Sequence, residues 1–158
     1  AKLRNQNIQA SVACEKDLRV VCSLGEIRQV LVNLIANAVD AMPDGGKLFL
    51  RGVKAPHPKT SVSGVRISVV DHGTGISRAT LRRMFEPFFT TKGDTGTGLG
   101  LWLTKDIMDR HQGLIQVRNH HRPKGSVFSI WIPEKPTKIN VEQLQKASGS
   151  PDTAGAGV

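Results

Sequence analysis

The segment "LGEIRQVLVNLIANAVDAM", residues 24–42, decides the fold, because its apolar residues recur at helical steps and predict an amphipathic helix. The residues expected on its buried face are Ile27, Val30, Leu31, Leu34, Ala38 and Ala41. The helix should stop at "PDGG", residues 43–46, where a proline and two glycines follow. Asn33 and Asn37 lie one turn apart within this apolar run. Asparagine is a middling helix former, so the pair points to a role beyond folding.

Shorter segments on both sides of this helix predict a sheet. Strands are expected at residues 8–14, 18–22, 47–53, 65–71, 114–119 and 126–132, and further helices at 78–85, capped by Ser77, and at 99–112, with Gly113 as the C-cap. We therefore expect one α/β domain over residues 1–133, a two-layer α+β sandwich with about three helices on one face of a mostly antiparallel sheet. The composition of residues 134–158 predicts a flexible C-terminal tail or linker with one helical turn at 140–147.

Composition narrows the function classes. With 158 residues, 39% hydrophobic and 22% charged, the chain is typical of a soluble domain, which we expect to be monomeric in isolation. No apolar stretch approaches the roughly 20 residues that cross a bilayer, and no signal peptide is visible. We therefore expect a cytoplasmic fragment without membrane contact, whether or not the full-length protein is membrane-anchored. The net charge of +9 is scattered and aromatics are only 4%, which argues against nucleic-acid binding. Cys14 and Cys22 should be reduced and buried.

Three further segments could form a binding site. "DHGTG", residues 71–75, follows an expected strand, although such a sequence alone is more often a tight turn. "FEPFFTTK", residues 85–92, could simply anchor a loop. "GTGLGL", residues 96–101, opens a helix and could direct backbone amides at an anion, although glycine-rich helix starts are common. Each motif alone leaves both interpretations open, and solvation could equally explain the asparagine pair.

Taken in order, the asparagine-bearing helix and these three motifs resemble the N, G1, F and G2 boxes of the catalytic domain of sensor histidine kinases. The likeness covers about residues 8–133, and "FEPFFTTK" is most similar to the nitrogen-regulator and oxygen-sensor type. The wider ATPase group includes DNA gyrase, the mismatch-repair ATPases and the large heat-shock chaperones. The resemblance implies a Bergerat-type ATP-binding fold with a flexible ATP lid.

The resemblance also implies an activity. A bacterial protein-histidine kinase of this kind uses MgATP, so ATP and Mg²⁺ are the expected cofactors. The γ-phosphoryl group would pass to a histidine on a dimerisation and phosphoacceptor domain that is absent from this chain. A response regulator receiver domain would be the next partner in two-component signal transduction.

At the adenine end, the resemblance assigns Asp71 as the acceptor of a hydrogen bond from the exocyclic amino group of adenine. Guanine has a carbonyl at that position and would present acceptor to acceptor. Gly73 and Gly75 would let the backbone approach the base and sugar. Ser126 falls where relatives place a hydroxyl that helps to hold the adenine end.

At the phosphate end, the resemblance assigns Asn37 as the Mg²⁺ ligand, since a hard cation prefers oxygen donors. Residues of the glycine-rich helix start, Gly96, Thr97, Gly98, Leu99 and Gly100, would bind the phosphates. Lys92 could reach the γ-phosphate and assist transfer. The aromatic residues of "FEPFFTTK", namely Phe85, Phe88 and Phe89, should anchor the lid.

Three positions bear on the kind of chemistry. Asn33 lies where hydrolytic relatives carry a glutamate general base, and an amide cannot accept a proton at neutral pH. We therefore assign Asn33 a catalytic position that keeps water from being activated. Two residues depart from the family pattern: His72 replaces the usual asparagine, and Asp40 stands where many members carry a phosphate-side lysine. A hydrolytic switch ATPase of the gyrase class and a catalytically silent ATP-sensing module remain as alternatives.

Overall fold

The computed structural model describes residues 7–93 and 96–135. Of the predicted tail at 134–158, all but Glu134 and Lys135 lies outside the described residues, as does the helical turn expected at 140–147.

A five-stranded sheet runs through the domain in the order β1-β2-β3-β5-β4. The strands are β1 (Ile8–Cys14), β2 (Gly46–Pro56), β3 (Ser63–Asp71), β4 (Leu114–His121) and β5 (Lys124–Pro133). β1 pairs in parallel with β2, whereas β2–β3, β3–β5 and β4–β5 are antiparallel. The sheet is therefore mixed but mostly antiparallel, as the sequence predicts.

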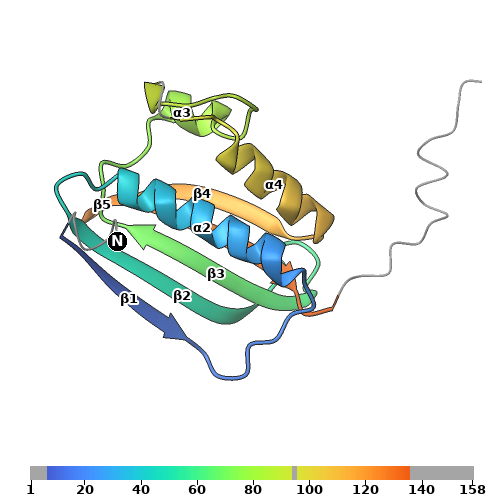
Figure 1. Cartoon of the computed structure of the whole chain (residues 1–158). Helices are drawn as coiled ribbons and strands as arrows, with labels where there is room; N and C mark the ends of the chain where they lie inside the picture. Colours follow the sequence, from blue (N-terminus) through green and yellow to red (C-terminus); the bar gives the residue numbers. More distant parts are fainter. Residues whose placement is uncertain (1–6, 94–95, 136–158) are drawn as a thin grey trace, which may run out of the picture.

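Three helices lie on one face of this sheet in the described part of the chain (Figure 1): α2 (Leu24–Asp40), α3 (Arg78–Arg83) and α4 (Gly100–Arg110). α2 presents the predicted apolar stripe to the sheet, and Val30 and Leu34 are fully buried. Met108 of α4 and Ile130 of β5 complete the same core, so the helix layer and the sheet share one hydrophobic interior. Among residues 7–93 and 96–135, no helix is long and apolar enough to span a bilayer.

The strand expected at 18–22 is wrong, because this segment forms no ladder with any described strand. Since β1 is parallel to β2, the chain must leave the sheet after Cys14 and cross to the start of α2. Val20 and Cys22 pack against the core during this crossing, so their alternation reflects packing rather than pairing. Cys14 is exposed, contrary to expectation, and both thiols are free.

The end of α4 also differs from its prediction, because Gln112 rather than Gly113 takes the left-handed conformation, with φ of 54°. The Gln112 N–H donates to the Asp109 carbonyl at 3.0 Å and the Gly113 N–H donates to the Met108 carbonyl at 2.8 Å, which is the Schellman pattern. Gly113 serves another purpose. A Cβ there would overlap Met108 and lie 2.6 Å from the Trp131 carbonyl oxygen, so glycine lets the helix end approach β5.

This close approach predicts opposite effects for two glycine substitutions. Gly113→Ala should lower the free energy of unfolding by about 1–3 kcal/mol, because the neighbouring backbone must shift to accept a methyl group. Gly25→Ala is the matched control, since Gly25 lies in α2 with no atom within 4 Å of an added Cβ. It should raise stability by up to about 1 kcal/mol through helix propensity. Urea denaturation followed by tryptophan fluorescence measures the stability of both variants. Equal stability of the two variants would contradict the close packing of Gly113 against β5.

Candidate functional site

A cleft of about 890 Å³ opens between α2, α3, the start of β5 and the segment between α3 and α4, of which residues 84–93 and 96–99 are described and are called here the α3–α4 loop. Its volume falls in the range of about 300–1,000 Å³ that is usual for small-molecule sites. The predicted site residues that line it are Asn33, Asn37, Gly75, Lys92, Gly96, Thr97, Gly98, Gly100 and Ser126. Asp71, Gly73 and Leu99 do not line it. The structure thus brings most of the predicted residues together.

Asp71 lies behind the wall of the cleft, at the end of β3, and is only 1% exposed. The strand register places it opposite Ser126 of β5. Its Oδ1 accepts the backbone N–H groups of Gly73 at 2.9 Å and Ser126 at 3.2 Å, and its Oδ2 accepts the Ser126 hydroxyl at 2.5 Å. Such donors are needed because a buried carboxylate without them is costly. Ser126, which bonds this carboxylate, itself lines the cleft.

The backbone around Asp71 leaves no room for additional side-chain atoms. A Cβ at Gly125 would overlap the Asp71 carbonyl oxygen, and one at Gly73 would overlap the Ala41 carbonyl oxygen at the end of α2. Gly75, with φ of 74°, takes a conformation that favours glycine. The two glycines of "DHGTG" therefore allow the turn to pack tightly against α2 and to reverse beside the cleft.

Asn119 of β4 supports this turn and is a site residue that the sequence does not reveal. Its Oδ1 accepts the Ile76 N–H at 2.9 Å and its Nδ2 donates to the Ile76 carbonyl at 2.6 Å. The side chain thus pairs with the turn as a neighbouring strand would. A single asparagine in a strand carries no signal of such a contact.

His72 lies on the same turn and its ring contacts a second histidine, His120. Partial burial lowers the pKa of His72 below its ordinary value, and the nearby His120 and Lys47 lower it further. The two rings lie edge to face with centroids 5.5 Å apart, and His120 Nε2 is 2.9 Å from the Asp71 carbonyl oxygen. His72 does not line the cleft, so its departure from the family pattern leaves the cleft wall unchanged.

Asn33 connects α2 to α4. Its Nδ2 donates to the Gly100 carbonyl oxygen at 3.1 Å and lies 3.4 Å from Thr104 Oγ1, while its Oδ1 accepts from Gln29 at 2.9 Å. Thr104 is fully buried and its hydroxyl also donates to the Gly100 carbonyl, at 2.8 Å. The Asn33 amide therefore holds the first turn of α4 against the edge of the cleft. Its assigned part in catalysis stays a prediction.

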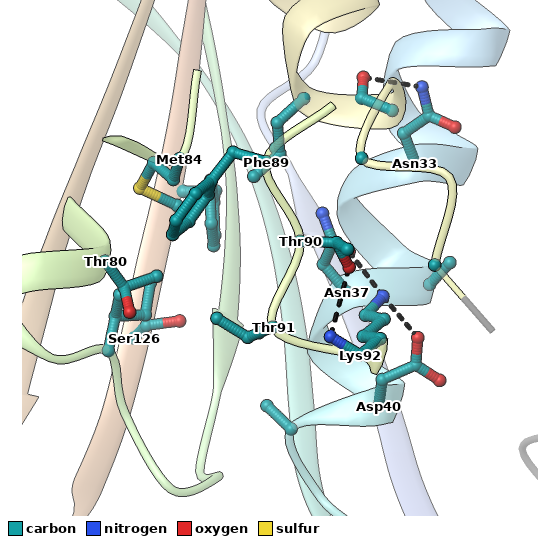
Figure 2. Close-up of a pocket in the computed structure, with 18 of the residues that line it drawn as sticks. Asn33, Asn37, Asp40, Thr80, Met84, Phe89, Thr90, Thr91, Lys92 and Ser126 are labelled. Carbon is teal, nitrogen blue, oxygen red and sulfur yellow. Dashed lines mark hydrogen bonds and ion pairs between the residues drawn. The ribbon is translucent and has the colours of Figure 1, made fainter. Parts of the chain in front are cut away.

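Asn37, one turn further along α2, faces the α3–α4 loop. Its Oδ1 accepts a hydrogen bond from Lys92 Nζ at 2.9 Å, and the same ammonium pairs with Asp40 Oδ2 at 2.6 Å (Figure 2). Two oxygen atoms on one face of α2 thus converge on one positive charge. The Asp40 carboxylate, which the sequence marks only as a departure from the family, is part of this arrangement.

The α3–α4 loop is held by two of its three predicted aromatic anchors. Phe85 and Phe89 pack against the core, and the Arg83 guanidinium lies 4.6 Å from the centre of the Phe89 ring. Phe88 is instead 75% exposed, with φ of 64°, so its prediction as an anchor is wrong. The backbone of Phe88, not its ring, packs closely against Gly98, because a Cβ at Gly98 would overlap the Phe88 backbone.

Several residues that line the cleft were not predicted. They include Thr80 of α3, Met84, Thr90 and Thr91 of the α3–α4 loop, and Phe128 of β5. Phe128 could have been found, because it lies two residues after Ser126 and strand neighbours at that spacing share a face. Thr90 and Thr91 lie where the sequence shows no periodicity, and the helix predicted over residues 78–85 is too short to assign a direction to Thr80 and Met84.

The fold and the cleft define an ATP-binding domain of the α/β sandwich type. The chain belongs to the family of histidine kinase-, DNA gyrase B- and HSP90-like ATPases, which matches residues 24–136. The predicted family and fold class are therefore confirmed, and ATP is the nucleotide that such a domain uses.

Named relatives are histidine kinases. Sporulation kinase A of Bacillus subtilis (strain 168) is 44% identical over 110 residues, which are 70% of this chain and 17% of that protein. The chain thus spans about a sixth of the length of that relative. The catalytic domain of histidine kinase ThkA, in a nucleotide-free form, superposes with a TM-score of 0.72 at 36% identity, covering 85% of this chain and 86% of that one. Full-length ShkA in complex with AMPPNP gives a TM-score of 0.70 at 26% identity, covering 86% of this chain and 27% of that one.

The contacts of Asn33 predict that its amide nitrogen is needed for stability. Asn33→Asp keeps the shape but points an acceptor at the Gly100 carbonyl oxygen, so the free energy of unfolding should fall by about 1–3 kcal/mol. Gln9→Glu makes the same amide-to-acid change on the exposed strand β1 and should have little effect. Urea denaturation measures both. An Asn33→Asp variant with the same free energy of unfolding as the wild type would show that the amide does not hold α4.

Proposed function

We propose that this chain is the catalytic part of a sensor histidine kinase, which binds MgATP in the cleft and delivers the γ-phosphoryl group to a histidine of another domain. The proposal rests on one observation: a single cleft has a hydrogen-bond acceptor buried directly behind its wall and, elsewhere on its wall, oxygen atoms that hold a cation. Asp71 with Ser126 supplies the first, and Asn37 with Asp40 and Lys92 supplies the second. Two ends with different chemistry suit a nucleoside triphosphate, because its base needs hydrogen-bond partners and its phosphates need positive charge.

The adenine end can be argued from hydrogen-bond capacity. A carboxylate has about four acceptor positions, and three of those on Asp71 are used by Gly73 N–H, Ser126 N–H and the Ser126 hydroxyl. The remaining position is on Oδ2, beside the hydroxyl that lines the cleft. It could accept the exocyclic amino group of adenine, whereas guanine would offer only a carbonyl oxygen there. Burial keeps this acceptor away from competing water.

The phosphate end suits a divalent cation. The Asn37 carbonyl oxygen and the Asp40 carboxylate are hard oxygen donors that already share one positive charge, that of Lys92. Mg²⁺ usually takes one or two such protein oxygens and completes its octahedron with phosphate oxygens and water. Bound there, it would neutralise charge on the transferring phosphoryl group. Backbone amides at Gly98 and Gly100, which line the cleft at the start of α4, would hold the phosphates.

Phosphoryl transfer rather than hydrolysis fits the absence of a base at Asn33. The Asn33 amide is engaged with Gly100 and Gln29 and cannot take a proton from water. The acceptor would be the histidine of a dimerisation and phosphoacceptor domain of the same full-length kinase, and a response regulator receiver domain would take the phosphoryl group next. The expected cytoplasmic location and the monomeric state of the isolated domain stay predictions.

The adenine assignment predicts that Asp71→Asn weakens ATP binding by about ten- to a hundredfold, the cost of a lost hydrogen bond to a charged acceptor. GTP affinity should fall less, because the new amide can donate to the guanine carbonyl, so the preference for ATP narrows. Asp109→Asn, on an exposed part of α4, is the matched control and should bind ATP normally. Calorimetry measures the ATP and GTP affinities of the wild type and of both variants. Unchanged ATP affinity in a folded Asp71→Asn variant would show that Asp71 does not read the base.

The assignment of the acceptor to another domain predicts that the isolated chain binds ATP but does not phosphorylate itself. Its five histidines are His57, His72, His111, His120 and His121, and none lines the cleft. In-line transfer requires the imidazole to lie about 3–3.5 Å from the reacting phosphorus. With radiolabelled ATP, acid-labile label should appear only when the native dimerisation domain is added. Label on the isolated chain would contradict an external acceptor, and rapid phosphate release without one would favour the hydrolytic alternative.

A further inference from the structure

The ammonium of Lys92 lies where the proposed metal ion should bind. It is 2.9 Å from Asn37 Oδ1, the oxygen assigned to Mg²⁺, and 2.6 Å from Asp40 Oδ2. Asn37 and Asp40 are three residues apart on α2 and therefore share a helix face. The ion pair joins residues 52 positions apart in the sequence, so it ties the α3–α4 loop to α2 across the cleft.

An ammonium and a magnesium ion cannot use this position together. Mg²⁺ binds oxygen at about 2.1 Å, so a metal on Asn37 Oδ1 would lie at most roughly 5 Å from an ammonium 2.9 Å from the same atom. Two cations at that separation repel each other strongly in a partly desolvated cleft. Binding of the metal therefore requires the lysine side chain to leave.

The Lys92 side chain lies at the surface of the cleft rather than in the core. It is 37% exposed, so solvent reaches it. The next residue, Gly93, has φ of 55°, a conformation that favours glycine. The cleft continues from Lys92 to Gly96 and Gly98, where phosphates would lie under the proposed function.

We propose that Lys92 is a placeholder for the metal ion. Without nucleotide, its ammonium occupies the position between Asn37 and Asp40; when MgATP binds, Mg²⁺ takes that position and the ammonium moves to the phosphates. Asp40 is then a positioning residue with two partners, the lysine before binding and the metal, directly or through water, afterwards. This inference rests on the proposed function, since it requires a metal–nucleotide complex in the cleft.

This exchange of the Lys92 ammonium for the metal ion explains why a carboxylate can stand at the phosphate end. With Mg²⁺ present, the metal compensates the charge of Asp40. Without metal, ATP must draw Lys92 away and leave the Asp40 carboxylate facing the phosphates, which opposes binding. Asp40 should thus make nucleotide binding depend on the metal and discriminate against free ATP.

The first test compares ATP binding in Mg²⁺ and in EDTA by calorimetry. For Asp40→Asn, we expect affinity for ATP in EDTA to rise and affinity for MgATP to fall, so that the ratio of the two dissociation constants shrinks about tenfold or more. Asp109→Asn is the matched control, because it removes the same charge from the exposed Lys105–Asp109 pair, at 2.7 Å on α4. Its ratio should equal that of the wild type. An unchanged ratio in Asp40→Asn would overturn the exchange.

The second test uses a metal without nucleotide. Mn²⁺ binding, followed by electron paramagnetic resonance, should tighten about tenfold in Lys92→Gln, because the two oxygens lose their competing cation. The gain should vanish in the double variant Lys92→Gln/Asp40→Asn. Lys105→Gln is the control for loss of a lysine charge and should behave as the wild type. Failure of Lys92→Gln to tighten Mn²⁺ binding would overturn the placeholder role.

The two levels of inference fail in different ways. A wild-type chain that binds ATP neither in Mg²⁺ nor in EDTA would refute the proposed function itself. A wild-type chain that binds ATP, with Asp40→Asn and Lys92→Gln indistinguishable from their controls, would leave the proposed function standing and refute only the exchange.

Discussion

The buried carboxylate of Asp71 is the constraint on which the β3–β5 end of the cleft depends. A charge that is 1% exposed needs several donors, and Ser126 supplies two of them only because β3 and β5 pair in one register. The third donor comes from Gly73, where a turn passes against the end of α2 with no space for a side chain. Strand register, turn and helix end must therefore all form before this acceptor is held in place.

α2 carries the other half of the site through residues one turn apart. Asn33 turns toward α4 and holds its first turn, whereas Asn37 turns toward the α3–α4 loop and its lysine. The same apolar stripe that buries Val30 and Leu34 against the sheet sets the direction of both amides. Folding and binding are thus linked within one helix, since a rotation that exposed the stripe would also turn both amides away from the cleft.

The positions of a negative charge on α2 and a positive charge on the loop affect how the proposed phosphate end could bind its ligand. The resemblance to sensor histidine kinases leads one to expect a lysine where this chain has Asp40. Here the nearby positive charge comes from Lys92 of the loop, paired with that aspartate. A cation on a loop can move, whereas one on a helix packed against the sheet is fixed. Under the proposed function, the phosphate end would therefore be built around a charge that can respond to its ligand.

The sequence by itself determined the elements that depend on short-range order: the α2 helix, the cap at Ser77, and the order of the glycine and asparagine motifs. Apolar period and turn residues are local properties, so they can be read without the fold. Local patterns failed at residues 18–22, where apolar alternation reflects packing, and at Phe88, which is exposed. Only the tertiary structure decided that Ser126 would bond Asp71 and that Lys92 would reach Asp40. Those contacts join residues 55 and 52 positions apart, and they follow from strand register and loop path, which long-range packing decides.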